Sequence, residues 1–373
     1  MHVVLAAGGT AGHIFPALNT ALAIRTLSPD TQITILGTRR GLDSELVPPA
    51  GFPLHLIDSV PFPRKINSQT IRFPLRLLRA VKETKAFFKK ENVQCVVGFG
   101  GYASAPAYLA ARSLGICMIV HEANSTPGIA NRLGARLTRN IAVNQAGVLS
   151  GGRVIGMPIS ENIRNLDRKA LNAQARNYFS LPSAGKVLLV FGGSQGARSI
   201  NSAIELALPD LLSAGIHVVH AVGAMNEIRT PEVVSEPHST NAQSTNPQST
   251  VGLYRPVPFI DRMDLAYAVA DLSINRAGAM TVGEIAAIGL PAVFVPLPIG
   301  NGEQEKNAQF LVNAGGALTC TNDSFTPDWI KENVIPLLND PVKLVTMSEK
   351  TLGTSSRDAA QELARWALAC EGD

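Results

Sequence analysis

Gly8-Gly9-Thr10-Ala11-Gly12-His13 follows a short apolar run, and a similar stretch, Gly192-Gly193-Ser194-Gln195-Gly196-Ala197, returns in the second half of the chain. Each copy precedes a helical pattern. Glycine allows positive φ and a close approach of backbone to ligand, and the N-terminus of a following helix presents unpaired N–H groups to an anion. The repeat therefore predicts two nucleotide-binding halves, with a phosphate-bearing ligand held between two domains.

Short apolar runs alternate with helical patterns through both halves of the chain. The expected strands cover residues 3–7, 33–36, 93–97, 117–120, 141–143 and 153–155 in the first half, and 187–191, 216–221, 272–274 and 292–295 in the second. Such alternation indicates parallel sheets with helices on both faces. We predict an α/β protein of two doubly wound, Rossmann-like domains whose sheets face a central cleft, with the ligand at the carboxyl ends of the strands.

The predicted domain boundary follows Gly156-Met157-Pro158, where a polar stretch begins. We expect a first domain over residues 1–159, a second over residues 160–352, and a final helix within residues 353–373 that can cross back to the first domain. Residues 231–250 contain almost no apolar side chains, which predicts a disordered surface insertion.

The composition fits a globular protein, since 46% of the 373 residues are apolar. No apolar run approaches the ~20 residues that span a bilayer, and Met1 leads directly into a strand, which predicts a cytosolic protein without a signal peptide. The cysteines are widely spaced, and Cys95 and Cys117 fall inside predicted strands. We expect buried free thiols rather than disulfides or metal ligands.

Positive charge is concentrated in one window of the first half. Its basic residues are Arg64, Lys65, Arg72, Arg76, Arg79, Lys82, Lys85, Lys89 and Lys90. The interleaved apolar residues Ile71, Leu75, Leu78 and Val81 recur at helical spacing, as in helices that meet an anionic membrane surface. The alternative is an amphipathic helix whose apolar stripe faces its own core. Nucleic acid is a weaker third alternative, because no nucleic-acid motif accompanies the charge.

Gly98-Phe99-Gly100-Gly101-Tyr102-Ala103 fits a dinucleotide-binding pattern, and Glu122 follows about twenty residues later. Against an NAD site, the loop follows an internal strand, and Glu122 stands beside His121 and the turn-forming Asn124-Ser125-Thr126-Pro127-Gly128. We therefore regard an oxidoreductase as a minor alternative.

A second turn-to-helix segment, Asn275–Glu284, follows a predicted strand of the second half. Thr281 and Glu284 have the spacing of a capping box, in which Glu284 only satisfies a backbone amide. The functional alternative is that the carboxylate accepts both hydroxyls of a ribose while the amides of the turn face a phosphate. Residues 300–308 are predicted to form a flexible polar loop that closes over a sugar, or a plain surface loop.

His13 directly follows the first glycine loop, so its imidazole is a candidate general base near the expected phosphates. The alternative is a histidine that only caps or packs at a helix start. The chain has no Asp-x-Asp pair. We therefore expect no cofactor and no metal, with helix dipoles and N–H groups stabilising a leaving diphosphate.

Taken together, these motifs resemble the MurG family, the bacterial cell-wall N-acetylglucosaminyltransferases. The matching stretches are Gly8–His13, Gly98–Tyr102, His121-Glu122-x-Asn124 with Pro127-Gly128, Gly192–Gly196 and Ala279–Glu284, in the order of the family. The resemblance implies a GT-B fold, with an acceptor- and membrane-facing first domain and a UDP-GlcNAc donor domain. It also implies inverting transfer to the 4-hydroxyl of undecaprenyl-pyrophosphoryl-MurNAc-pentapeptide, at the cytoplasmic face of the cell membrane.

The resemblance also implies roles for single residues. Catalysis falls to His13, with Glu122 as the reserve base. Donor contacts fall to Thr10, Ala11, Gly12, Asn124, Ser194, Ile260, Ala279, Met280, Thr281, Val282, Gly283, Glu284 and Gln304. Contacts to the acceptor diphosphate fall to Gly12, His13, Gly100, Gly101 and Tyr102. The membrane patch comprises Ile71, Arg72, Leu75, Arg76, Leu78, Arg79, Val81 and Lys82.

The implied partners are UDP-GlcNAc, the undecaprenyl-linked acceptor, an anionic inner-leaflet surface and other cell-wall synthesis proteins, with no nucleic acid. The sequence departs from the family where Ser160 replaces a phosphate-facing arginine. Arg164, one helical turn on, is the predicted substitute. Ala123 replaces a common glutamine. A UDP-GlcNAc epimerase of the same fold and a non-enzymatic nucleotide-sugar sensor remain as alternatives.

Overall fold

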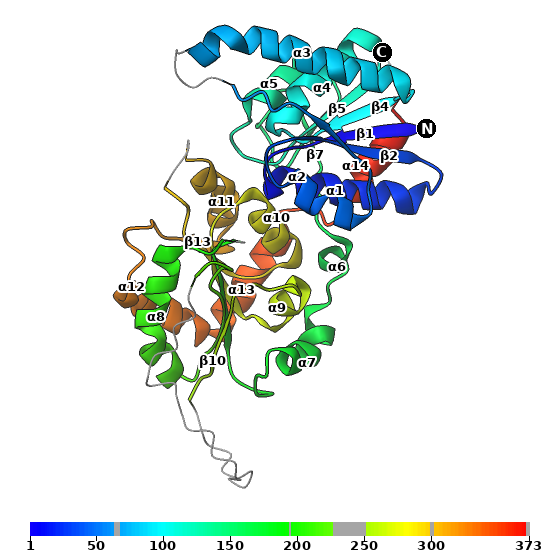
Figure 1. Ribbon diagram of the computed structural model, residues 1–373. Helices are drawn as coiled ribbons and strands as arrows, with labels where there is room; N and C mark the ends of the chain where they lie inside the picture. The colour runs from blue at the N-terminus through cyan, green and yellow to red at the C-terminus, as the bar shows by residue number, and fades with distance from the viewer. Residues whose placement is uncertain (63–67, 194, 227–250, 299–301, 371–373) are drawn as a thin grey trace. The chain divides into compact units, whose positions relative to one another are not determined.

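The computed structural model describes residues 1–62, 68–193, 195–226, 251–298 and 302–370, with the backbone alone for residues 68–72. The chain forms two compact units (Figure 1). Unit 1 comprises Met1–Arg164 together with Ser355–Asp373, and unit 2 comprises Asn165–Thr354. The predicted insertion at residues 231–250 lies outside the described residues. Among the described helices, none has the length and apolar character needed to cross a bilayer.

Unit 1 is built on a seven-stranded sheet in the order β3-β2-β1-β4-β5-β6-β7, with every neighbouring pair parallel. The strands are β1 (His2–Ala6), β2 (Gln32–Thr38), β3 (Leu54–Ile57), β4 (Cys95–Gly98), β5 (Cys117–Glu122), β6 (Ile141–Val143) and β7 (Arg153–Val154). The central strands are buried along their whole length, which is why they read as continuous apolar runs.

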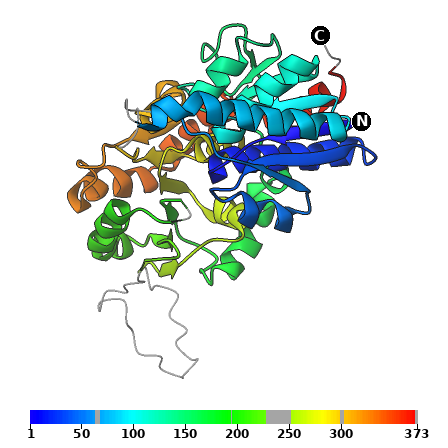
Figure 2. The same cartoon turned by 45° about the horizontal axis from the view of Figure 1, so that its top comes forward.

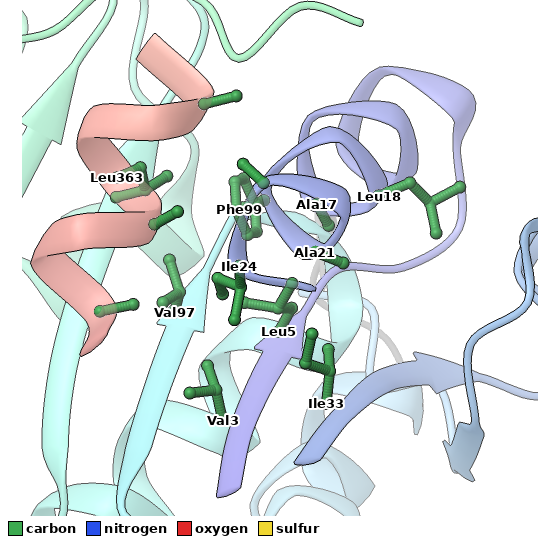
Figure 3. Close-up of a cluster of buried hydrophobic side chains, with 14 of the residues drawn as sticks. Val3, Leu5, Ala17, Leu18, Ala21, Ile24, Ile33, Val97, Phe99 and Leu363 are labelled. Atoms are coloured by element: carbon green, nitrogen blue, oxygen red, sulfur yellow. The ribbon is translucent and has the colours of Figure 1, made fainter. Parts of the chain in front are cut away.

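Helices cover both faces of this sheet. They are α1 (Ala11–Leu27), α2 (Asp43–Leu46), the 3-10 turn η1 (Pro48–Ala50), α3 (Ser68–Lys90), α4 (Gly101–Leu114), α5 (Ile129–Gly134), α6 (Glu161–Arg164) and α14 (Ala359–Leu368). One core lies between the sheet and the helices α1 and α14, where Leu5, Ile24 and Leu363 meet (Figure 3). The other core places Phe88 of α3 and Tyr108 of α4 against the opposite face.

Unit 2 has a six-stranded, all-parallel sheet in the order β10-β9-β8-β11-β12-β13. Its strands are β8 (Val187–Phe191), β9 (His217–Ala221), β10 (Tyr254–Val257), β11 (Leu272–Asn275), β12 (Ala292–Phe294) and β13 (Ala317–Thr319). Its helices are α7 (Arg168–Tyr178), α8 (Arg198–Ser213), α9 (Met263–Val269), α10 (Ala279–Ile288), α11 (Glu303–Ala314), α12 (Pro327–Leu338) and α13 (Pro341–Leu352). The predicted class, two doubly wound α/β units, is confirmed.

The chain passes between the units near residues 164 and 355, a few residues from the predicted boundaries of 159 and 352. Residues 160–164, predicted to belong to the second domain, belong to unit 1. The final helix α14 packs on α1 and contributes Leu363 to the unit 1 core. At its start, Asp358 pairs with Arg164 at 2.6 Å between Oδ1 and Nε. The C-terminal segment of the chain therefore completes the hydrophobic core of unit 1.

The expectation of four free thiols is wrong for one pair. Cys117 on β5 and Cys370 after α14 form a disulfide, with Cα atoms 6.0 Å apart, while Cys95 and Cys320 are free and buried. A separation of 253 residues gives no spacing signal in the sequence, because the two cysteines meet only when α14 packs on unit 1.

Candidate functional site

Each sheet has one point where the strand order reverses, and each reversal lies between two glycine turns. In unit 1 the neighbours are β1 and β4, followed by Gly8-Gly9 and by Gly100-Gly101. In unit 2 they are β8 and β11, followed by Gly192-Gly193 and by Gly278. Ligands of open α/β sheets bind at the carboxyl ends of strands at such switch points. The fold therefore gives each unit one candidate site, made of two turns and two helix N-termini.

The two turns of unit 1 are packed so closely that only glycine fits. Gly9 has φ +91° and Gly101 has φ +76°, and a Cβ on Gly101 would overlap the carbonyl of Gly8. A Cβ on Gly41 would likewise overlap the backbone of Gly9. The ring of Tyr102 lies beside Gly9, with 41% of the residue exposed. Gly101 and Tyr102, both predicted to face the acceptor diphosphate, therefore lie beside the first glycine turn.

Asp43, at the start of α2, holds the first glycine turn and was missed by sequence reasoning. Its carboxylate is fully buried and accepts the N–H of Gly9 at 3.0 Å and the N–H of Thr38 at 3.4 Å. Burial raises the pKa of Asp43, while these hydrogen bonds lower it. Its position in the sequence resembles an ordinary acidic helix start. The contact between Asp43 and Gly9 becomes apparent only in the fold, where residues 37–43 pack against the first glycine turn.

His13 lies in the first turn of α1, next to both glycine turns. Its Nδ1 is 3.0 Å from the hydroxyl oxygen of Thr10. A Cβ built on Gly100 would stand 3.1 Å from Nε2, so the other edge of the ring faces that glycine. Burial lowers the pKa of His13 below its usual value of 6.5. The imidazole is therefore neutral at physiological pH, the form a general base requires.

Glu122, the reserve base, is surrounded by donors from its own loop. Oε1 accepts the backbone N–H of Asn124 at 2.9 Å, and Oε2 accepts the N–H of Gly128 at 3.0 Å and the side-chain amide of Asn131 at 2.9 Å. The residue is 2% exposed. A carboxylate engaged in this way fixes the loop after β5 and the start of α5, and does not act as the ribose acid of a dinucleotide site.

Asn124 is held by the same carboxylate, since its side-chain nitrogen lies 3.4 Å from Glu122 Oε1. Asn131 extends the network, accepting the Tyr108 hydroxyl at 2.8 Å and donating to the carbonyl of His121 at 3.0 Å. The position of Asn124, predicted to contact the transferred sugar, is therefore set by groups buried beneath the loop.

The glycine turn of unit 2 is held by neutral groups. Gly193 has φ +100° and Gly196 has φ +73°, and the N–H of Gly196 donates to the carbonyl of Gly193 at 2.9 Å. Asn226 donates to the carbonyls of Gln195 and Val222, at 3.0 and 2.8 Å. Ser194, the predicted phosphate contact of this turn, lies outside the described residues.

Deeper in unit 2, Asn201 of α8 donates to the same Val222 carbonyl at 2.8 Å and accepts from His220 at 3.1 Å. Burial lowers the pKa of His220 to about 4, so this histidine stays neutral and serves the packing of the turn.

Helix α10 begins at Ala279, with Gly278 as its N-cap. The capping-box interpretation of Thr281 and Glu284 is therefore wrong, because Thr281 already lies inside the first turn. The first amides of a helix have no intrahelical partner, and the positive end of its dipole favours an anion. Those amides belong to Ala279, Met280 and Thr281, whereas Val282 already donates to the carbonyl of Gly278.

Glu284 lies one turn further along α10, with Val282 and Gly283 buried beside it. Its Oε2 accepts the hydroxyl of Tyr267 at 2.8 Å, which leaves Oε1 for another donor. Burial raises the pKa of Glu284 to about 7. A carboxylate that is desolvated and only partly satisfied matches the expected ribose acceptor.

Two further predicted donor contacts lie in unit 2. Ile260 is buried in the loop after β10, at the carboxyl edge of the sheet. Gln304 accepts the N–H of Leu297 through Oε1 at 2.9 Å and retains its amide hydrogens as donors. The predicted flexible loop is wrong for residues 303–308, because Glu303–Ala314 is helix α11. Residues 300 and 301 lie outside the described residues.

Arg164 ends the short helix α6, and its backbone N–H donates to the carbonyl of Ser160 at 2.8 Å. Its guanidinium is engaged by Asp358, and its carbonyl accepts from Arg357 at 3.3 Å. The side chain therefore joins the two places where the chain leaves and re-enters unit 1. A role at a phosphate stays a prediction.

The alternative in which the whole apolar stripe of α3 faces its own core is wrong for Leu75 and Leu78. Ala80, Thr84 and Phe88 are buried, and Val81 packs beside them on the core under α4. Leu75 and Leu78 are instead 62% and 65% exposed. Arg76, Arg79 and Lys82 are exposed as well, and Arg76 donates to the carbonyl of Ser59 at 2.9 Å. The side chains of Ile71 and Arg72 lie outside the described ones.

The apolar stripe is therefore divided between core and solvent. Within unit 1, α3 is an outer layer in both views (Figures 1 and 2). Leu75 and Leu78 form an exposed apolar patch with Arg76, Arg79 and Lys82 beside it on the same helix.

Comparison with known proteins identifies both halves of the chain. Residues 3–143 match the family model described as glycosyltransferase family 28 N-terminal domain, and residues 187–363 match the glycosyltransferase family 28 C-terminal domain. Relatives from Nocardia farcinica and Mycobacterium leprae are each 48% identical over 99% of this chain, covering 95% and 88% of their own lengths. Both are named UDP-N-acetylglucosamine--N-acetylmuramyl-(pentapeptide) pyrophosphoryl-undecaprenol N-acetylglucosamine transferase.

Solved structures of glycosyltransferases have the same fold as this chain. The crystal structure of Acinetobacter baumannii MurG is 28% identical, with a TM-score of 0.74, 98% of this chain and 99% of that chain covered. The kitacinnamycin glycosyltransferase, 16% identical with a TM-score of 0.66 over 98% of this chain and 97% of that one, shares the fold. These neighbours confirm the GT-B architecture of the two α/β units.

Proposed function

Because the chain belongs to glycosyltransferase family 28, we propose that it transfers N-acetylglucosamine from UDP-GlcNAc to the C4 hydroxyl of undecaprenyl-pyrophosphoryl-MurNAc-pentapeptide, with inversion. This reaction, lipid I to lipid II, belongs to peptidoglycan synthesis. The near full-length identity to relatives that bear the name of this activity supports the proposal. The feature of the fold that supports it is a switch point in each unit, flanked by two glycine turns and two helix N-termini.

The donor site is assigned to unit 2. The free amides at the start of α10 and the dipole of that helix suit the diphosphate of UDP, and Glu284 suits the ribose hydroxyls. Ile260 would meet the uracil and Gln304 the sugar hydroxyls. As the bond from the anomeric carbon to UDP breaks, the α10 amides stabilise the charge on the leaving diphosphate, as preorganised dipoles do.

The acceptor site is assigned to unit 1. His13, neutral because of its lowered pKa, takes the proton of the C4 hydroxyl while that oxygen attacks the anomeric carbon opposite UDP. The starts of α1 and α4, near Gly12 and Gly100-Gly101-Tyr102, suit the diphosphate of the acceptor. Glu122, with its oxygens occupied, acts by positioning Asn124 near the transferred sugar.

The test is incubation with labelled UDP-GlcNAc and a short-chain analogue of the lipid-linked acceptor, with and without a chelator. The proposal predicts a disaccharide product whose formation survives chelation. An epimerised UDP-sugar formed without acceptor, or no product from the lipid-linked acceptor, would refute it.

The same proposal places the protein at the cytoplasmic face of the cell membrane, bound peripherally through the α3 patch. We expect binding to anionic vesicles that weakens with salt and with Leu75→Ser/Leu78→Ser. Leu206→Ser is a matched control, since Leu206 is 70% exposed on α8 of unit 2. Binding that is insensitive to both salt and the α3 variant would contradict this attachment.

A further inference from the structure

Three cysteine sulfurs gather at the edge of unit 1 where the strands begin, opposite the candidate site. Cys95 of β4 and Cys117 of β5 are register partners on neighbouring strands, and Cys370 approaches them from the end of α14. All three sulfurs lie within 4.8 Å of one another. The side-chain nitrogen of Asn140 lies 3.9 Å from the sulfur of Cys117 and 3.8 Å from that of Cys370.

A pocket opens beside this cluster. It has a volume of about 540 Å³, and its lining includes Gln94, Ile116, Leu368 and Cys370. Cys370 is half-buried, whereas Cys117 is 3% exposed and Cys95 is fully buried. Of the three sulfur-bearing residues, Cys370 is therefore the one that a small molecule in the pocket can reach.

We propose that the Cys117–Cys370 disulfide is a reversible staple of α14 that exchanges with a low-molecular-weight thiol entering through this pocket. The thiolate of the small molecule attacks the sulfur of Cys370, forming a mixed disulfide there. The Cys117–Cys370 bond breaks, and its electron pair leaves with the sulfur of Cys117, which takes up a proton. A second small thiolate then releases Cys370 as a thiol and departs as the symmetrical disulfide.

Cys95 stays outside the exchange despite its proximity. Burial raises the pKa of Cys95 to about 12, so its thiol remains protonated, and only thiolates attack disulfides. The pair that exchanges is therefore fixed by access through the pocket rather than by distance alone.

The Cys117–Cys370 disulfide links the end of α14 to strand β5 of unit 1. Helix α14 buries Ala359, Leu363 and Ala367 against α1, the helix that begins with the His13 turn. The bond joins residues 253 positions apart, and a cross-link over so long a separation strongly restricts the unfolded chain. Opening the bond removes this restriction while leaving the apolar packing of α14 in place.

The experiment exposes the full chain and its cysteine variants to oxidised glutathione, followed by peptide mapping by mass spectrometry. We expect a Cys117–Cys370 disulfide in the unaltered protein, one glutathione on Cys370 in Cys117→Ser, and none on Cys117 in Cys370→Ser. Reduced glutathione lowers the Tm of the unaltered protein by at least about 4 °C and leaves that of Cys370→Ser unchanged.

Cys320→Ser and Cys95→Ser are the matched controls. Cys320 is a buried free cysteine of unit 2, and Cys95 is the free cysteine of the cluster that takes no part in the proposed exchange. Both variants are expected to behave as the unaltered protein does. Glutathione on Cys320 as readily as on Cys370, or no disulfide and no adduct in any protein, overturns the proposal. Zinc retained by the unaltered protein and lost in Cys95→Ser overturns it too, in favour of a metal site.

Discussion

The glycine turns of the two units share a backbone pattern but differ in what holds them. In unit 1 the buried carboxylate of Asp43 takes the N–H of Gly9. In unit 2 the amides of Asn226 and Asn201 bind carbonyl oxygens around the turn. The Gly9 N–H that donates to this carboxylate is unavailable to a phosphate, so in unit 1 an anion is left to the starts of α1 and α4. Amide groups that donate to carbonyl oxygens, in contrast, bring no negative charge to the turn of unit 2.

This difference teaches that one motif serves two tasks. We infer that the turn of unit 1 supports His13, whereas the turn of unit 2, with the start of α10, is proposed to bind the donor's diphosphate. The repeat by itself predicts one phosphate-bearing ligand between two similar halves, whereas the flanking residues and the family resemblance already imply two diphosphates, one in a donor domain and one in an acceptor domain. The contacts favour a division in which unit 2 holds the donor's diphosphate and unit 1 provides the base.

The largest expected effect follows from His13→Ala, which removes the base. We expect kcat to fall by about 10²–10⁴-fold, the usual contribution of general base catalysis. Because burial lowers the pKa of His13, the acid limb of the kcat profile lies below pH 6.5 in the unaltered enzyme and is absent in the variant. Steady-state kinetics across pH check both expectations, and an unchanged kcat would remove His13 from the reaction.

Asp43→Asn tests whether the buried carboxylate keeps the unit 1 turn in place. The amide retains one acceptor oxygen and brings an unpaired donor towards Gly9 or Thr38, a cost of about 1–3 kcal/mol. We expect kcat to fall by about 10–100-fold, with little change in the KM for UDP-GlcNAc. Asp58→Asn is the matched control, since the Asp58 side chain is 75% exposed on the same unit. Equal effects of the two variants would contradict the positioning role.

Glu284→Gln probes the donor site in unit 2. Loss of a charged acceptor is expected to raise the KM for UDP-GlcNAc by about tenfold. Since the pKa of Glu284 is raised to about 7, the carboxylate becomes protonated below neutrality. In the unaltered enzyme the KM should therefore rise as the pH falls through about 7, whereas in Glu284→Gln it should not. A pH-independent KM in both proteins would argue against a ribose contact.

The smallest effect concerns Arg164, the predicted substitute for the phosphate-facing arginine that Ser160 replaces. Arg164→Ala is expected to raise the KM for UDP-GlcNAc by about threefold, and Asp358→Asn separates the two explanations. If Arg164 acts only by joining the chain crossings, both variants change the KM equally, because each removes the ion pair. A rise in Arg164→Ala alone supports the phosphate contact, and an unchanged KM contradicts it.

The sequence predicted the central strands and the edge strand β7, but not the other three edge strands. Leu54–Ile57, Tyr254–Val257 and Ala317–Thr319 were missed, and each is the outermost strand of its sheet. An edge strand pairs on one side only and is partly exposed, so it lacks the continuous apolar run of a strand buried on both faces. The glycine turns and helix starts were visible because tight turns need glycine at particular positions.

Contacts between residues that are far apart in the sequence could not be predicted from it. Asp43 and Cys370 are ordinary residues until the fold brings them to Gly9 and Cys117. The family resemblance implied Glu122 as a reserve base, and the structure shows its oxygens occupied by donors of its own loop. Whether the Glu122 carboxylate accepts these hydrogen bonds depends on the path of the loop to Gly128, which the local sequence does not specify.

Calorimetric titration of UDP into His13→Ala and Glu284→Ala tests the division between the two units most directly. His13→Ala is expected to bind UDP with the affinity of the unaltered protein, while Glu284→Ala binds it at least about tenfold more weakly. The opposite pattern, with UDP affinity lost in His13→Ala and kept in Glu284→Ala, would contradict it.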